Sequence, residues 1–135
     1  MKKIMFLFLL AFAVNSCSLS DEATSQEALL PIESVEMPQT FTPDSSSTIM
    51  VSYRRPTDCH IFNGFHYTTV EDSVTTIGIR AVVFNQDNCT DDSGNLYEVP
   101  LDFVPTEAGE YRFKFWTGND AQGQPTFIEH TVEVQ

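Results

Sequence analysis

In the stretch EYRFKFWT, residues 110–117, polar and apolar side chains alternate one by one from Glu110 to Phe115. Successive side chains of a β-strand point to opposite faces, so this pattern predicts a strand with one buried face. The inward face would carry Tyr111, Phe113 and Phe115. The outward face would carry Arg112, Lys114 and Trp116.

The same alternation recurs on both sides of this stretch, between clusters of Gly, Pro, Asn, Asp and Ser. It predicts six further strands, over residues 32–37, 48–54, 59–69, 75–84, 96–104 and 126–134. No sustained apolar stripe of helical period lies between them. Seven short strands, each with one apolar face, predict an all-β domain of two antiparallel sheets, a small β-sandwich over residues 31–135.

Residues 107–113, which lead into this predicted strand, resemble a corner of immunoglobulin-like domains. In that family a tyrosine two residues before an inward core position hydrogen-bonds back to the backbone. The resemblance implies that Tyr111 has this role and that the sandwich is immunoglobulin-like. Phe113 stands where antibody domains have a cysteine, so their intersheet disulfide is not implied.

The first residues have the order of an export signal: Lys2 and Lys3, an apolar run over residues 4–14, and then small residues. The run has about 11 residues, whereas a membrane-spanning helix needs roughly 20. The segment VNSC, residues 14–17, resembles the lipobox of bacterial lipoproteins. This resemblance implies that residues 1–16 are a cleaved signal peptide and that Cys17 carries the lipid.

The residues after Cys17 bear on where the protein is held. Ser18 and the acidic pair Asp21-Glu22 resemble the surface-export signal of Bacteroidota lipoproteins. The resemblance implies a lipid-anchored outer-membrane protein that faces outward, with a periplasm-facing orientation as the alternative. Residues 17–30 are rich in Ser, Glu, Ala, Thr and Gln, and this composition predicts a flexible tether.

Acidic residues dominate the chain, with 19 Asp and Glu against 7 Lys and Arg and a formal net charge of −12. Removal of a signal containing Lys2 and Lys3 would leave five basic residues and a charge of −14. Such a chain repels nucleic-acid phosphates and anionic lipid headgroups. We therefore expect no nucleic-acid partner, and we expect the acyl chains on Cys17 to be the membrane contact.

Two cysteines remain once Cys17 carries lipid. In an oxidising compartment, Cys59 and Cys89 are predicted to form a disulfide. A catalytic thiol or a metal site is the alternative, but the chain has neither a CxxC motif nor a histidine at ligand spacing from these cysteines.

One loop has a calcium-like register in the manner of an EF-hand, with oxygen-bearing residues at Asp87, Asp91, Ser93, Asn95 and Glu98. Cys89 occupies another ligand position, and Asp92 stands where the turn needs glycine. A polar turn is therefore favoured over a calcium site.

The histidines give little support for metal binding or catalysis. His60 and His66 would lie about 20 Å apart along one strand, too far to share an ion. His130 falls in the last predicted strand. The chain has no nucleophile elbow and no phosphate-binding glycine loop. We predict no metal, no cofactor and no enzymatic activity.

The outward face of the last two predicted strands is the candidate partner-binding surface. It would combine Arg112, Lys114 and Trp116 with Phe127 of the returning strand. Tryptophan and arginine are enriched where proteins bind one another. The alternative is ordinary cross-strand pairing of the basic residues with Glu129 or Glu133. Elsewhere, the motif DSV at residues 72–74 matches the Bacteroidota O-glycosylation acceptor and marks Ser73 as a possible glycosylation site.

These features together predict a non-enzymatic, lipid-anchored interaction or accessory module that presents its surface to a protein or glycan. A small ligand- or calcium-binding protein or a hydrolase of the cell envelope is the first alternative, and it would need a concave polar pocket. A structural envelope component is the second.

Overall fold

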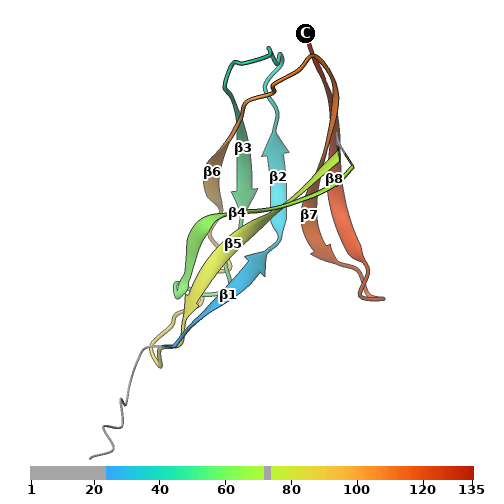
Figure 1. Ribbon diagram of the computed structural model, residues 1–135. Coiled ribbons are helices and arrows are strands. Elements are labelled where there is room, and N and C mark those ends of the chain that lie inside the picture. The colour runs from blue at the N-terminus through green and yellow to red at the C-terminus, as the bar shows by residue number, and fades with distance from the viewer. Residues whose placement is uncertain (1–23, 72–73) are drawn as a thin grey trace, which may run out of the picture.

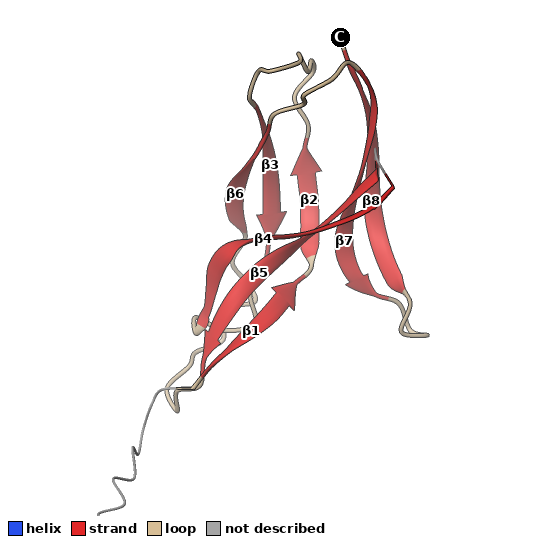
Figure 2. Ribbon diagram, in the orientation of Figure 1, coloured by secondary structure: helices blue, strands red, loops and turns tan. Residues whose placement is uncertain are grey.

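The computed structural model describes residues 24–71 and 74–135, which leaves Cys17, Ser73 and the expected signal peptide outside the described residues. The described chain forms eight strands and no helix (Figure 2). No helix in this part of the chain has the length and apolar character needed to cross a membrane. The strands are β1 (Ser25–Leu30), β2 (Ile32–Glu36), β3 (Ser47–Tyr53), β4 (His60–Glu71), β5 (Val74–Phe84), β6 (Tyr97–Phe103), β7 (Gly109–Asn119) and β8 (Pro125–Val134).

The strands form two sheets packed as a small sandwich (Figure 1). The larger sheet has the order β1-β5-β7-β8, with β4 also paired to β5, and the smaller sheet has the order β2-β3-β6. All pairs are antiparallel except β5 with β7, which run parallel. The predicted all-β sandwich is confirmed, and each of the seven predicted strands is present.

The prediction of a flexible tether over residues 17–30 is wrong for its last six residues. Ser25–Leu30 form β1, which pairs with β5 from Ser25 opposite Phe84 to Leu30 opposite Ile79. Only Ala28 and Leu30 of this strand are shielded from solvent. Because the other positions are exposed, most of them can be polar, and the sequence of the strand resembles that of a linker. After Pro31 the chain crosses to the smaller sheet as β2, and the sandwich has eight strands rather than seven.

The structure contains one local contact expected from the immunoglobulin resemblance, but its larger sheet differs. The Tyr111 hydroxyl donates a hydrogen bond to the Glu107 carbonyl oxygen at 3.0 Å, and Phe113 two residues later is buried, so the backbone contact expected of Tyr111 is present. The larger sheet departs from the antiparallel sheets of immunoglobulin domains, because β5 and β7 run parallel within it.

The core lies between the inner faces of the two sheets. Ile49 and Val51 of β3 belong to the same core cluster as Ile79 of β5 and Phe115 of β7, and all four are fully buried. The Phe103 and Phe113 rings meet edge to face across the sheets at a centroid distance of 5.0 Å. The remaining buried apolar residues are Leu30, Ile32, Phe41, Tyr53, Cys59, Ile77, Ala81, Leu101, Phe113 and Val134.

The domain has two distinct ends. β1 starts at the lower end in Figure 1, beside the loops that precede β4 and follow β5. The chain ends at Gln135 at the opposite end, where the connections between β2 and β3 and between β6 and β7 also lie. The start of β1 and the C-terminus therefore lie at opposite ends of the domain.

Candidate functional site

The predicted partner-binding residues lie on the outward side of the β7–β8 hairpin. Lys114 is opposite Glu129 in the strand register, and Trp116 is opposite Phe127. Arg112 lies two residues before Lys114 and is opposite Thr131. We call Arg112, Lys114, Trp116, Phe127 and Glu129 the β7–β8 face.

The basic residues of the β7–β8 face already have neighbours of their own. Lys114 Nζ lies 3.5 Å from Glu129 Oε1 and 4.5 Å from the centre of the Phe127 ring. Arg112 reaches Glu110 on its own strand at 3.8 Å. The cross-strand pairing alternative is thus realised for Lys114. Exposed ion pairs of this kind contribute only about 0–1 kcal/mol, so they do not prevent exchange for a partner's charges.

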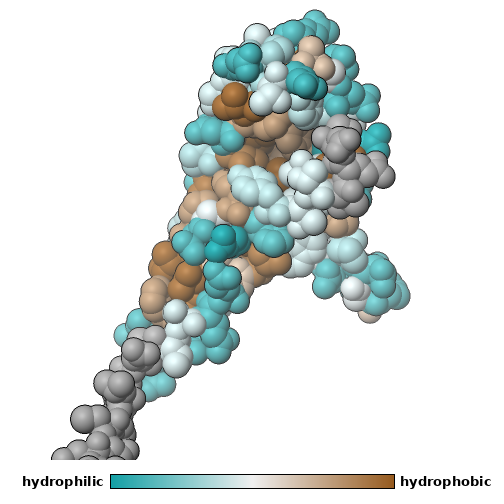
Figure 3. Space-filling view, in the orientation of Figure 1, coloured by the Kyte–Doolittle hydropathy of each residue, from teal (hydrophilic) through white to brown (hydrophobic). Residues whose placement is uncertain are grey.

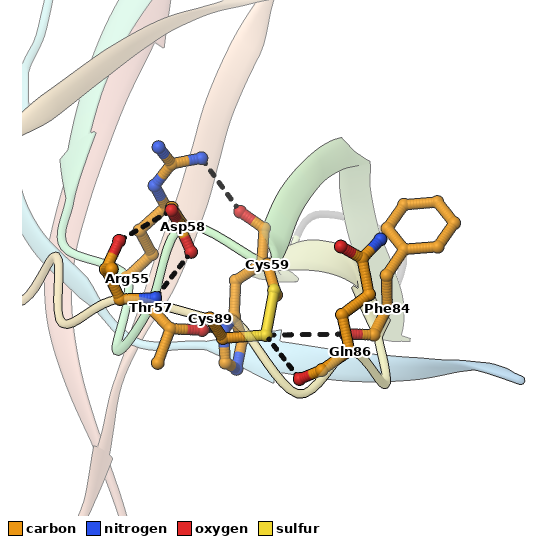
Figure 4. The surroundings of a disulfide bond; sticks show 9 residues. Arg55, Thr57, Asp58, Cys59, Phe84, Gln86 and Cys89 are labelled. Carbon is orange, nitrogen blue, oxygen red and sulfur yellow. Dashed lines mark hydrogen bonds between the residues drawn. A yellow bond between two sulfur atoms is a disulfide. The ribbon is translucent and has the colours of Figure 1, made fainter. Parts of the chain in front are cut away.

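The two cysteines Cys59 and Cys89 form the predicted disulfide, with a Cα–Cα distance of 5.6 Å (Figure 4). Hydrogen bonds join the same two loops: Asp58 accepts from the Thr90 backbone N–H at 2.9 Å and from its hydroxyl at 2.6 Å. Both bonds lower the pKa of Asp58. Thr57 also forms an isolated β-bridge with Asp91. We call residues 54–60 and 84–97 the locked end.

A polar cluster that the sequence did not reveal closes the locked end. Arg55 pairs through Nε with Asp92, donates from a terminal nitrogen to the Tyr97 hydroxyl at 3.0 Å, and donates to the His60 carbonyl at 3.1 Å. Tyr97 and Asn95 donate to the Asp92 carboxylate at 2.6 and 2.5 Å. The only signal was positional, since Arg55 precedes Cys59 by four residues and Asp92 follows Cys89 by three.

The Asp92 carboxylate is the most perturbed acid of the cluster. It is 9% exposed, and hydrogen bonds from Tyr97, Asn95 and Arg55, in decreasing order of effect, lower its pKa to about 2. A carboxylate held in its ionised form by three donors is a poor proton donor at neutral pH. Its geometry suits a structural ion pair rather than acid–base chemistry.

The calcium-like loop is held together by its own donors. The Asp91 carboxylate accepts from the Ser93 N–H at 2.8 Å and from its hydroxyl at 2.6 Å, which is the geometry of a polar turn. Among the described residues, one group has metal-ligand proximity, namely Asp58, Cys59 and Cys89. The two sulfurs of that group are bonded to each other and therefore do not act as thiolate ligands.

The three histidines have separate environments. A ring nitrogen of His60 lies 3.0 Å from the Thr57 hydroxyl, and one of His66 lies 3.2 Å from the Thr68 hydroxyl. His130 points inward, where its ring meets Phe115 edge to face. Their contacts are those of structural histidines.

An apolar groove of about 160 Å³ opens between the sheets. Figure 3 shows apolar patches on the surface of the domain, in both its upper and its lower part. The walls of the groove are Tyr67, Thr75, Ile77, Leu101, Asp102, Phe103, Val104 and Phe113. Its volume lies below the roughly 300–1,000 Å³ of a typical small-molecule site.

Comparison with known proteins identifies no relative of this chain. No protein-family model matches it, and searches of curated proteins and of solved structures return no match.

Proposed function

We propose that this chain is a lipid-anchored outer-membrane or surface lipoprotein that acts as a non-enzymatic interaction module. The observation that carries the proposal is the run of charged, apolar and small residues ending at Cys17, followed within a few residues by a folded β-domain. The arrangement of that domain supports it, because β1 begins at one end and the domain extends away from there (Figure 1). Acyl chains on Cys17 would hold the β1 end near the membrane and leave the sides of the sandwich accessible.

The carboxylates of the locked end support a role without catalysis. Asp58, Asp91 and Asp92 all have lowered pKa values, and in each case the main cause is a hydrogen bond from another residue of the chain. These acids are engaged in holding loops together. Catalytic carboxylates more often face a cleft in which a substrate can reach them.

The β7–β8 face is the proposed partner surface. Trp116 and Phe127 lie opposite each other, with Lys114 over the Phe127 ring. Aromatic side chains beside a cation supply the contact area and directional interactions found at binding hot spots. A protein or glycan partner would contact this aromatic pair.

The anchor is tested by mass spectrometry of protein purified from the native membrane, together with the variant Cys17→Ala. Wild type should begin at an acylated Cys17 and fractionate with the outer membrane, and Cys17→Ala should lose both properties. Ser20→Ala is the matched control and should behave as wild type. An intact bond between Ser16 and an unmodified Cys17 would contradict the proposal. The same spectra would reveal a glycan on Ser73, with Ser73→Ala as its control.

The partner surface is tested by crosslinking on intact cells. Trp116→Ala should abolish a crosslinked product that wild type forms. Tyr67→Ala is the control, because Tyr67 is also aromatic and is 54% exposed, but lies on β4 rather than on the β7–β8 face. Equal capture by wild type and Trp116→Ala would show that the partner binds elsewhere.

A further inference from the structure

Sheet edges differ in how well they are protected against pairing with another strand. Among the described residues the edge strands are β1, β2, β4, β6 and β8. Short length, proline and bulges commonly protect such edges. β1 and β2 have six and five residues and flank Pro31, β6 contains Pro100, and β4 has an irregularity between Phe62 and Phe65 that includes Gly64 at φ 89°.

β8 lacks this protection. It has ten residues, its one proline is the first of them, and its register with β7 is regular from Phe127 to Val134. Its outer side is paired at the far end, where Val134 bridges Phe41 and the Gln135 N–H donates to the Phe41 carbonyl at 3.2 Å. Backbone groups alternate in direction along a strand, so those of Phe127, Glu129 and Thr131 also point away from β7. In the described part of the chain they have no backbone partner.

Space for another strand lies beside this free edge. Residues 37–42 and 130–133 form the walls of an open groove of about 700 Å³. Neighbouring strands need a spacing of only about 4.8 Å. Met37 and Val132 line the groove and also pack against the core, so its floor is partly apolar. An extended segment in the groove would place alternate side chains on that floor and the others on the outward face.

The carboxylates near the outer edge of β8 favour a docking segment of positive charge. Glu133 lies directly opposite Glu110 in the register, and like charges at such positions repel. Arg112 on β7 reaches Glu110 at 3.8 Å, and Glu133 has no ion pair among the described residues. A second copy pairing through β8 would bring further carboxylates to the same place, whereas a cationic segment would neutralise those already there.

We propose that β8 is a docking edge for an extended cationic segment of a partner protein. The segment would add to the larger sheet as a strand, with apolar side chains over Met37 and Val132 and basic side chains beside Glu129 and Glu133. This inference rests on the proposed function and names the class of partner that the module would bind.

The test measures fluorescence anisotropy of a labelled peptide of four Lys-Val repeats with the full protein in detergent micelles. The Lys-Val peptide should bind, and a matched Glu-Val peptide should not. Thr131→Pro removes one outward N–H and should weaken binding about tenfold, as expected for the loss of one backbone hydrogen bond. Thr131→Val keeps that N–H and should bind as wild type. Equal binding of both peptides, or of Thr131→Pro and wild type, would overturn the proposal.

A second measurement covers the case in which Thr131→Pro does not fold. A Lys-Val peptide with its four central backbone nitrogens methylated should fail to bind wild-type protein, since it lacks the donors that strand addition requires. Undiminished binding would show that the peptide adheres by charge alone. Sedimentation without peptide should show a monomer, and a dimer that the Lys-Val peptide dissociates would identify a second copy as the occupant and overturn the proposal.

The lipid anchor and the docking edge are tested by independent measurements. The peptide assay uses solubilised protein, so an unacylated Cys17 would contradict the anchor without changing peptide binding. A lack of peptide binding would remove the docking edge and leave the lipid anchor intact.

Discussion

The locked end and the β8 edge differ in how they are held. The locked end joins two loops by a disulfide, an ion pair and several side-chain hydrogen bonds. β8 is held on one side by β7, while its residues 130–133 line an open groove on the other side. Local stability is therefore concentrated beside β1, where the proposed anchor enters, while the β8 side of the sandwich remains free to pair.

The largest expected effect on stability comes from removing the disulfide of the locked end. Replacing Cys59 and Cys89 by alanine should lower the free energy of unfolding by about 3.5 kcal/mol in the chain-entropy model. The cause is the release of a loop whose ends are 30 residues apart. Guanidinium unfolding of the double variant, and of wild type with and without reductant, measures the loss. An unchanged midpoint would mean that the locked end does not dominate stability.

The next effect comes from the ion pair. Arg55→Met should destabilise the fold less than loss of the disulfide, because Asp92 keeps its bonds to Tyr97 and Asn95 but loses its cation. Arg80→Met is the matched control: Arg80 pairs with Glu27 at an exposed position outside the locked end, so its loss should cost at most about 1 kcal/mol. Urea unfolding compares them. Equal losses would place Arg55 among ordinary surface residues.

The same cluster predicts a response to acid. Asp92 has a pKa of about 2 in the folded chain and an ordinary value of 3.8, so its stabilising effect is present above about pH 4 and disappears as the pH falls toward 2. Asp58 and Asp91 act in the same direction. The melting temperature should therefore fall below pH 4, and less steeply in Asp92→Asn, which should start from a lower value at pH 6. Parallel profiles would contradict this role of Asp92.

Much of the sandwich could be predicted because alternation reports burial directly. The alternating residues Ile49, Val51, Ile79 and Phe115 are all fully buried. β1 was missed because its polar residues face solvent and only two positions turn inward. The parallel pairing of β5 with β7 could not be predicted, since parallel and antiparallel strands share the same period of two.

The candidate sites were predictable to different degrees. The disulfide could be predicted from the number of cysteines and an expected oxidising compartment. The composition of the β7–β8 face could be predicted because alternate residues of a strand point to the same side. The cluster of Arg55, Asp92 and Tyr97 depends on two loops meeting in space, which no local pattern encodes. The free edge of β8 also required the sheet order, because its sequence resembles that of any half-buried strand.

The smallest expected effect on stability is at the edge itself. Thr131→Pro should change the free energy of unfolding by less than about 1 kcal/mol, because its N–H faces the groove and proline is tolerated at such edge positions. His130→Pro should cost about 1–3 kcal/mol, because its N–H faces β7, where His130 is opposite Phe113. Urea unfolding of the two variants measures the contrast. Equal losses would mean that both sides of β8 are paired.

The most direct test of the free docking edge is amide hydrogen exchange, resolved by residue with NMR. The amides of Phe127, Glu129 and Thr131 should exchange much faster than those of Ile128, His130 and Val132, which face β7. Addition of the Lys-Val peptide should slow exchange of the first set and leave the second set unchanged. Equal protection of the two sets in the free protein, or no change at the edge amides with peptide bound, would contradict the account.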